Sequence, residues 1–89
     1  MSDKLLLVDD EPGLREAVQA YLCDSGFTVE VATNGQEGWE KLQQDIPDLV
    51  ISDIMMPEVD GYQLLKQMRE DPRLKSIPVV FLTARGMTS

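Results

Sequence analysis

The stretch DLVISDIMMPEVDGYQLL, residues 48–65, decides the fold of this chain. It opens with the apolar run 49–51 and breaks at Asp53. An apolar run this short, bounded by turn-forming residues, is typical of a strand buried on both faces. Residues 55–57 then turn the chain, and Asp60-Gly61 opens a helix. The stretch therefore predicts a buried strand, a loop and a helix, with the Asp53 carboxylate at the carboxyl end of the strand.

Three other segments also have the character of strands. An apolar run ends at Val8 and is followed by Asp9 and Asp10, and the run 79–82 is followed by Thr83. The segment TVEVA, residues 28–32, instead alternates polar and apolar residues, which is typical of an edge strand with one wet face.

The first helix is expected to begin at Pro12, because proline suits the first turn of a helix, with Asp10 or Glu11 as its cap. Gly26 is placed to end this helix in a left-handed conformation. Apolar residues at helical spacing predict a buried stripe. Its members are Leu14, Ala17, Val18, Tyr21 and Leu22.

The second and third helices carry the same kind of start signal. Asn34 is the expected cap of the second helix, with Glu37 at capping-box spacing. The third helix is expected over about residues 61–70, where Asp71-Pro72 stops it.

The resulting order βαβαβαβ predicts an α/β fold, a doubly wound parallel sheet with right-handed crossovers and three helices. The alternating second strand belongs at an edge, which favours the strand order 2-1-3-4. The winding direction then reverses between the first and third strands, and ligands bind outside the carboxyl ends of strands at such a point. Asp9, Asp10 and Asp53 are the residues at those ends.

Composition limits the possible functions. The chain has 89 residues, which fits one small domain, and its net charge of -8 argues against nucleic acid or an anionic membrane as a direct partner. It has no His and only Cys23, so an internal disulfide, a Cys or His metal set and a Cys-His nucleophile are excluded. Neither a signal peptide nor a membrane-spanning run is present, so a cytoplasmic location is expected.

Three neighbouring carboxylates repel one another, and without a cation one of them would have to take up a proton. Mg²⁺ removes the repulsion, since it prefers oxygen ligands and binds through one or two carboxylates plus a phosphate. A carboxylate beside Mg²⁺ can also act as a nucleophile and become an aspartyl phosphate. The simpler interpretation is that Asp10 is a helix cap, Asp53 a strand-end residue and Thr83 a buried hydroxyl.

The chain resembles the receiver domain of two-component response regulators, which has a flavodoxin-like fold. The resemblance lies in LLLVDDEPGLRE near the start, DLVISDIMMPEVDGYQLL in the middle and IPVVFLTA near the end. It implies that Asp53 accepts a phosphoryl group from a sensor histidine kinase. It also implies that Asp10 binds Mg²⁺ directly, that Asp9 assists through water, and that the Met55 carbonyl is a further ligand.

The same resemblance assigns roles around the phosphoryl group. Thr83 is the expected switch hydroxyl, and the backbone N–H groups of Ile54, Met55 and Ala84 are expected to bind phosphoryl oxygens. Pro57 and Gly61 match the loop and the helix start, where their expected roles are structural. The domain would assist its own phosphorylation and dephosphorylation without being an enzyme in any other sense.

The sequence departs from the family after Thr83-Ala84, where the family continues with a helix, a strand that carries a lysine, and a last helix. Lys75 is the last lysine of this chain. Residues 1–89 are therefore expected to be an incomplete receiver domain with impaired signalling. A homodimer through the exposed fourth strand or the uncovered sheet face is also expected.

Two other classes of protein were weighed. A phosphatase or phosphotransferase with an aspartyl nucleophile would resemble a chain with Asp-x-Asp after its first strand and a cap domain, whereas this strand ends in Asp-Asp-Glu-Pro. An interaction module with a vestigial acidic site would not respond to Mg²⁺. A flavin or dinucleotide site is disfavoured, because no glycine-rich turn follows the first strand.

Overall fold

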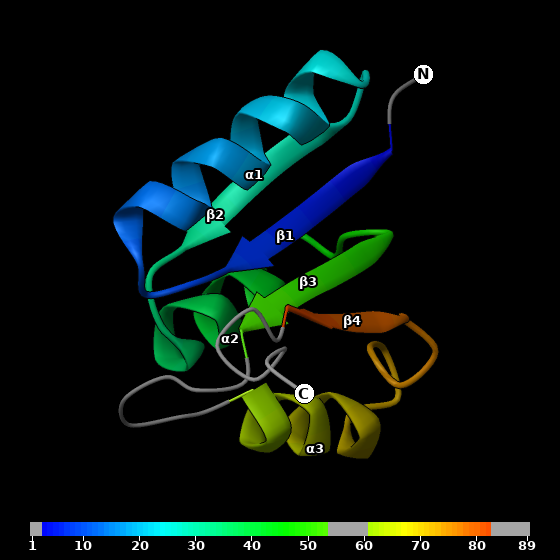
Figure 1. Cartoon of the computed structure of the whole chain (residues 1–89). Coiled ribbons are helices and arrows are strands. Elements are labelled where there is room, and N and C mark those ends of the chain that lie inside the picture. The colour runs from blue at the N-terminus through cyan, green and yellow to red at the C-terminus, as the bar shows by residue number, and fades with distance from the viewer. Residues whose placement is uncertain (1–2, 54–60, 83–89) are drawn as a thin grey trace, which may run out of the picture.

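The structure is a computed structural model, and it describes residues 3–53 and 61–82. Strands and helices alternate along the chain (Figure 1). The elements are β1 (Lys4–Val8), α1 (Pro12–Asp24), β2 (Thr28–Ala32), α2 (Gly35–Gln44), β3 (Leu49–Asp53), α3 (Gly61–Glu70) and β4 (Val79–Leu82). The predicted order of elements and the predicted extent of the third helix are both confirmed.

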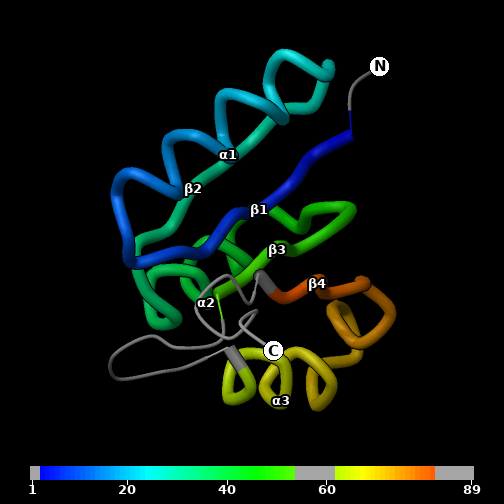
Figure 2. The backbone as a smooth tube through the Cα atoms, viewed as in Figure 1, coloured from blue at the N-terminus to red at the C-terminus, as the bar shows by residue number. Residues whose placement is uncertain are grey.

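The four strands form one parallel sheet in the order β2-β1-β3-β4, as the sequence predicts. Val8 at the end of β1 lies opposite Ala32 of β2 and opposite Ser52 of β3. This register brings the carboxyl ends of β1 and β3 to the same edge of the sheet, and the backbone trace shows the two strands running side by side (Figure 2). The reversal of winding therefore falls between these two strands.

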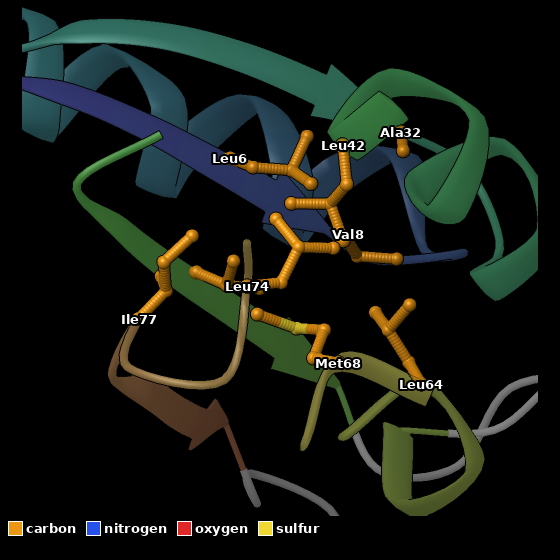
Figure 3. Close-up of a cluster of buried hydrophobic side chains, with 9 residues drawn as sticks. Leu6, Val8, Ala32, Leu42, Leu64, Met68, Leu74 and Ile77 are labelled. Carbon is orange, nitrogen blue, oxygen red and sulfur yellow. The ribbon is translucent and has the colours of Figure 1, made fainter. Parts of the chain in front are cut away.

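The larger core cluster lies between the sheet and the helices α2 and α3 (Figure 3). Leu6 and Val8 of β1 meet Leu42 of α2 and Met68 of α3 there, and all four are at most 2% exposed. Because side chains alternate across a strand, Leu5 and Leu7 point to the opposite face. There they join Ile51 in a smaller cluster against which Val18 and Leu22 of α1 pack.

The buried stripe predicted for α1 is only partly observed. Leu14, Val18 and Leu22 are only half-buried, Ala17 is exposed and Tyr21 is 71% exposed. Within the described residues α1 contacts β1 and β2 and no other helix packs beside it on that face, so its flanks meet water. Gly26 does end the helix as predicted, with a φ of 98°.

The caps of the first two helices lie where they are predicted, but the cap of α1 lacks a side-chain bond. Glu11 occupies the N-cap position of α1 but makes no side-chain cap bond, and its N–H donates to Asp9 Oδ1 at 2.9 Å. Asn34 caps α2 as predicted, because its Oδ1 accepts from the Glu37 N–H at 2.8 Å. The Glu37 carboxylate reaches back to Thr33, whose N–H and hydroxyl together offer two donors to Oε1 at 2.6 and 2.8 Å.

Two helical glycines are expected to respond oppositely to alanine. A Cβ at Gly38 would lie 3.0 Å from Val8 Cγ2 and 3.7 Å from Leu64 Cδ2, so Gly38→Ala should cost about 1 kcal/mol through overpacking. A Cβ at Gly13 would meet nothing within 4 Å, so Gly13→Ala should gain about 0.5–1 kcal/mol from helix propensity. Urea unfolding of both variants measures the difference, and a Gly38→Ala variant as stable as Gly13→Ala would contradict this close packing.

Candidate metal centre

Three aspartates meet at the switch point of the sheet. Asp9 and Asp10 directly follow β1, and Asp53 is the last residue of β3. Each offers one carboxylate oxygen, and these oxygens all lie within 4.8 Å of one another. Asp9 is 0% exposed and Asp53 is 5% exposed, whereas Asp10 is half-buried. The structure thus brings together the three carboxylates that the strand pattern placed at one edge.

Asp9 is fixed in place through three of its polar atoms. Its backbone N–H donates to the Ala32 carbonyl at the end of β2 at 3.0 Å. Its Oδ1 accepts from the Glu11 N–H, and its own carbonyl accepts from Arg15 Nη1, both at 2.9 Å. The neighbouring strand and the first turns of α1 therefore set the orientation of this residue.

The fourth polar atom of Asp9 has no such partner. Asp9 Oδ2 is buried, and no described residue donates a hydrogen bond to it. Burial raises the pKa of Asp9, the Glu11 N–H opposes that rise, and the negative charges of Asp53, Asp10 and Glu11 add to it. A buried carboxylate oxygen without a donor, beside two further carboxylates, costs free energy unless a cation or a proton neutralises it.

The chemistry of this donor set fits Mg²⁺. All three side chains offer hard oxygen atoms, and His and Cys, which suit softer metals, are absent from the cluster. Oxygens that share one octahedral Mg²⁺ lie about 3–4 Å apart, so carboxylates grouped as closely as these need only a small adjustment or a bridging water. Asp9, Asp10 and Asp53 are the described residues that would hold the ion.

The raised pKa of Asp9 predicts how the metal-free chain responds to pH. The stability that Asp9 contributes is fully present below its ordinary pKa of 3.8 and is lost as the pH rises through the raised value. Asp9→Asn should therefore raise the midpoint of thermal unfolding in a chelator at pH 7.5 by roughly 5 °C.

The difference between Asp9→Asn and the unchanged chain should shrink as the pH falls through the raised pKa of Asp9, below which the carboxyl group is also neutral. Thermal scans of both proteins across this range measure it. A midpoint difference that stays constant with pH would mean that the charge of Asp9 is not the destabilising element.

Several predicted site residues lie outside the described residues. These are Ile54, Met55, Pro57, Thr83 and Ala84. Gly61 is the first residue of α3, as predicted. The sequence analysis did not single out Arg15, although a basic residue near the start of a helix is unusual enough to have drawn attention.

An open parallel sheet with helices on both faces and an acidic cluster at its switch point defines a flavodoxin-like α/β domain with a candidate cation site. The family model for the response regulator receiver domain matches residues 5–89. The chain belongs to the response regulator receiver domain family, whose members act in two-component systems with histidine kinases.

Individual comparisons agree with this assignment. The chain is 68% identical over 85 residues to Response regulator Rre1 of Synechocystis sp., a match that covers 94% of this chain and 37% of that protein. The signal receiver domain of a signal transduction histidine kinase from Syntrophus aciditrophicus superposes with a TM-score of 0.89 at 39% identity, covering 92% of this chain and 62% of that one.

A second solved structure is similarly close. The N-terminal domain of a response regulator receiver protein from Methanoculleus marisnigri gives a TM-score of 0.88 at 38% identity, with 92% of this chain and 67% of that one covered. This chain thus spans well under half the length of the curated relative Rre1. In the described ranges, 3–53 and 61–82, no helix combines the length and apolarity needed to cross a membrane.

Proposed function

We propose that this chain is a phosphoacceptor module, in which Asp53 takes a phosphoryl group from a histidine kinase with the help of Mg²⁺. The observation that carries the proposal is the grouping of three carboxylate oxygens within 4.8 Å, one of them on a buried aspartate with an unpartnered oxygen. Such a group of carboxylates favours the binding of a divalent cation. A cation held there can take a phosphoryl oxygen as a further ligand.

The positions of the three aspartates support a different role for each of them. Asp53 ends β3 and faces the cluster, so it is the proposed nucleophile. Asp10 is half-buried and more accessible than Asp9, which supports a direct bond from Asp10 to the metal. The side chain of Asp9 is held by the Glu11 N–H, which supports an assisting role through water.

The reaction is a displacement at phosphorus. An Asp53 carboxylate oxygen forms a bond to phosphorus while the phosphorus–nitrogen bond of a phosphohistidine breaks, and the imidazole leaves with the electron pair. Bound Mg²⁺ would neutralise charge on the transferring oxygens. Attack of water on phosphorus later breaks the bond to the Asp53 oxygen, releases inorganic phosphate and restores the carboxylate, which is the self-dephosphorylation that the family resemblance implies.

The remaining roles rest on the family resemblance. The Met55 carbonyl completes the metal ligands, the N–H groups of Ile54, Met55 and Ala84 bind phosphoryl oxygens, and Thr83 acts as the switch hydroxyl. A cytoplasmic location and the lack of direct binding to nucleic acid by this segment stay predictions.

Incubation of the 89-residue chain with Mg²⁺ and a small acyl phosphate, followed by intact-mass measurement, tests the proposed function. We expect one added phosphoryl group that does not form when a chelator is present from the start, and that is removed by hydroxylamine, which cleaves acyl phosphates. A chain that stays unlabelled at high donor concentration would contradict the proposal.

We also infer that the 89-residue chain self-associates through β4. Among the strands that the structure describes, β4 is last in the sheet order, and Val80, opposite Ile51 on the α1 face, is 49% exposed. An apolar edge strand is a template for pairing with another chain. Sedimentation at micromolar concentration should show a dimer, and Val80→Lys should raise its dissociation constant at least about tenfold.

Tyr21→Lys is the matched control for Val80→Lys, because Tyr21 is 71% exposed on α1, away from β4. It should leave the dimer intact. A monomeric unchanged chain, or an equal response to both substitutions, would count against an interface at β4.

A further inference from the structure

Arg15 is a cation placed near the wrong end of its helix. It follows the first turn of α1, which contains no acidic residue, and the helix macrodipole disfavours positive charge at that end. Arg15 is half-buried, and its Nη1 donates to the backbone carbonyl of Asp9 at 2.9 Å. Helix stability does not account for an arginine here, so its contact with Asp9 is the feature to explain.

The bond from Arg15 acts on the peptide that joins two of the clustered aspartates. A peptide unit is planar, so fixing the Asp9 carbonyl also fixes the direction of the Asp10 N–H and the position of the Asp10 Cα, from which its side chain starts. Asp9 is held as well by its N–H to Ala32 and by the Glu11 N–H to Oδ1. In two of these three bonds the partner of Asp9 is a backbone group. Only in the third is the partner a side chain, that of Arg15.

Arg15 also lies near the loop that follows β2. The Glu37 carboxylate accepts from the N–H and the hydroxyl of Thr33. These two bonds hold the pKa of Glu37 below its usual value, and the positive charges of Lys41 and Arg15 lower it further. The Arg15 guanidinium thus bonds to the loop after β1. Its positive charge also favours the ionised carboxylate of Glu37, which holds the loop after β2.

We propose that Arg15 is a positioning residue for the cation site, which by holding the Asp9 carbonyl keeps the Asp9 and Asp10 carboxylates directed at Asp53. Arg15 itself does not touch the cation. The proposal rests on the proposed function, since it assigns Arg15 a role in the Mg²⁺ affinity of that same site.

The molecule provides a matched control. Arg69 at the end of α3 uses its own Nη1 to bond the carbonyls of Lys75 and Ile77, both at 3.0 Å. It therefore makes the same kind of arginine-to-carbonyl contact. This contact does not involve the ends of β1 and β3, where the three clustered aspartates lie. A substitution at Arg69 shows what losing such a contact does to folding alone.

The experiment is calorimetric titration of MgCl₂ into the unchanged chain and into Arg15→Ala, Arg15→Lys and Arg69→Ala, with thermal unfolding of each protein in a chelator. Arg15→Ala should weaken Mg²⁺ binding by about tenfold or more, the usual effect of losing a residue that orients a ligand. Arg15→Lys should recover part of the affinity, because an ammonium can still donate to the carbonyl. Arg69→Ala should bind Mg²⁺ within about twofold of the unchanged chain even where its unfolding midpoint falls.

Each outcome decides the question. An Arg15→Ala chain that binds Mg²⁺ as the unchanged chain does would overturn the positioning role and leave the metal site standing. Equal losses of Mg²⁺ affinity in Arg15→Ala and Arg69→Ala would mean that the effect comes from general destabilisation of the fold. If the chain without substitutions binds no Mg²⁺, both the proposed metal site and the positioning role are wrong. If Arg15→Ala fails to fold, Arg15→Lys compared with Arg69→Lys decides, and equal Mg²⁺ affinities in that pair would again overturn the role.

Discussion

Asp53→Asn is expected to abolish phosphoryl labelling of the 89-residue chain, the largest single effect that the proposed function predicts. Asparagine keeps the shape of the side chain, but its amide is a far weaker nucleophile than a carboxylate. Asp53 is 5% exposed at the end of β3 and shares its cluster with Asp9 and Asp10, whose proposed role is to hold the cation. Intact-mass measurement with Mg²⁺ and an acyl phosphate gives the fraction labelled.

Asp48→Asn is the matched control for this experiment. Asp48 immediately precedes the amino end of β3, and its Oδ2 accepts from the Lys4 N–H at 2.8 Å, far along the strand from the cluster. This variant should be labelled like the unchanged chain. Labelling that survives in Asp53→Asn would show that the acceptor is another residue, and peptide mapping would then identify it.

Mg²⁺ affinity should fall on the order of 100-fold in Asp10→Asn, and by a similar factor in Asp53→Asn. Each substitution removes a full negative charge next to a divalent cation, where even a well-screened interaction amounts to several kcal/mol. The same substitutions relieve repulsion in the cluster, so the metal-free variants should unfold at higher temperature than the unchanged chain. Titration calorimetry and thermal unfolding in a chelator measure the two effects.

The opposite signs of these two effects distinguish a metal site from a generally important residue. A residue needed only for folding would lower both the affinity and the unfolding midpoint. Asp45→Asn supplies the control, since Asp45 is exposed and pairs with Lys4 outside the cluster. Unaltered affinity in both Asp10→Asn and Asp53→Asn would remove these residues from the metal site.

The architecture was predictable because the strand and helix patterns are local. Residues 49–51 form a continuous apolar run and become a strand buried in the centre of the sheet, whereas TVEVA alternates and becomes the edge strand β2. Chain order and the handedness of crossovers then restrict the possible arrangements to a few. The same strand pattern predicts that Asp9, Asp10 and Asp53 lie at one edge of the sheet.

The prediction was less accurate where the outcome depends on what packs nearby. The spacing of apolar residues in α1 indicates which face turns inward, but it does not indicate how much of that face other elements cover. Tyr21 is therefore 71% exposed although it fits the helical stripe. The cap of α1 differs for a related reason, because the Asp9 carboxylate accepts the Glu11 N–H from outside the helix.

The sequence by itself thus determined the fold, the strand order and the identity of the acidic residues, since periodicity and the position of each residue along its strand carry that information. Only the tertiary structure decided that Asp9 is fully buried, that Oδ2 has no donor among the described residues, and that Arg15 reaches back to the Asp9 carbonyl. Burial and hydrogen bonding between separate elements depend on distances across the fold, and residue spacing along the chain does not encode those distances.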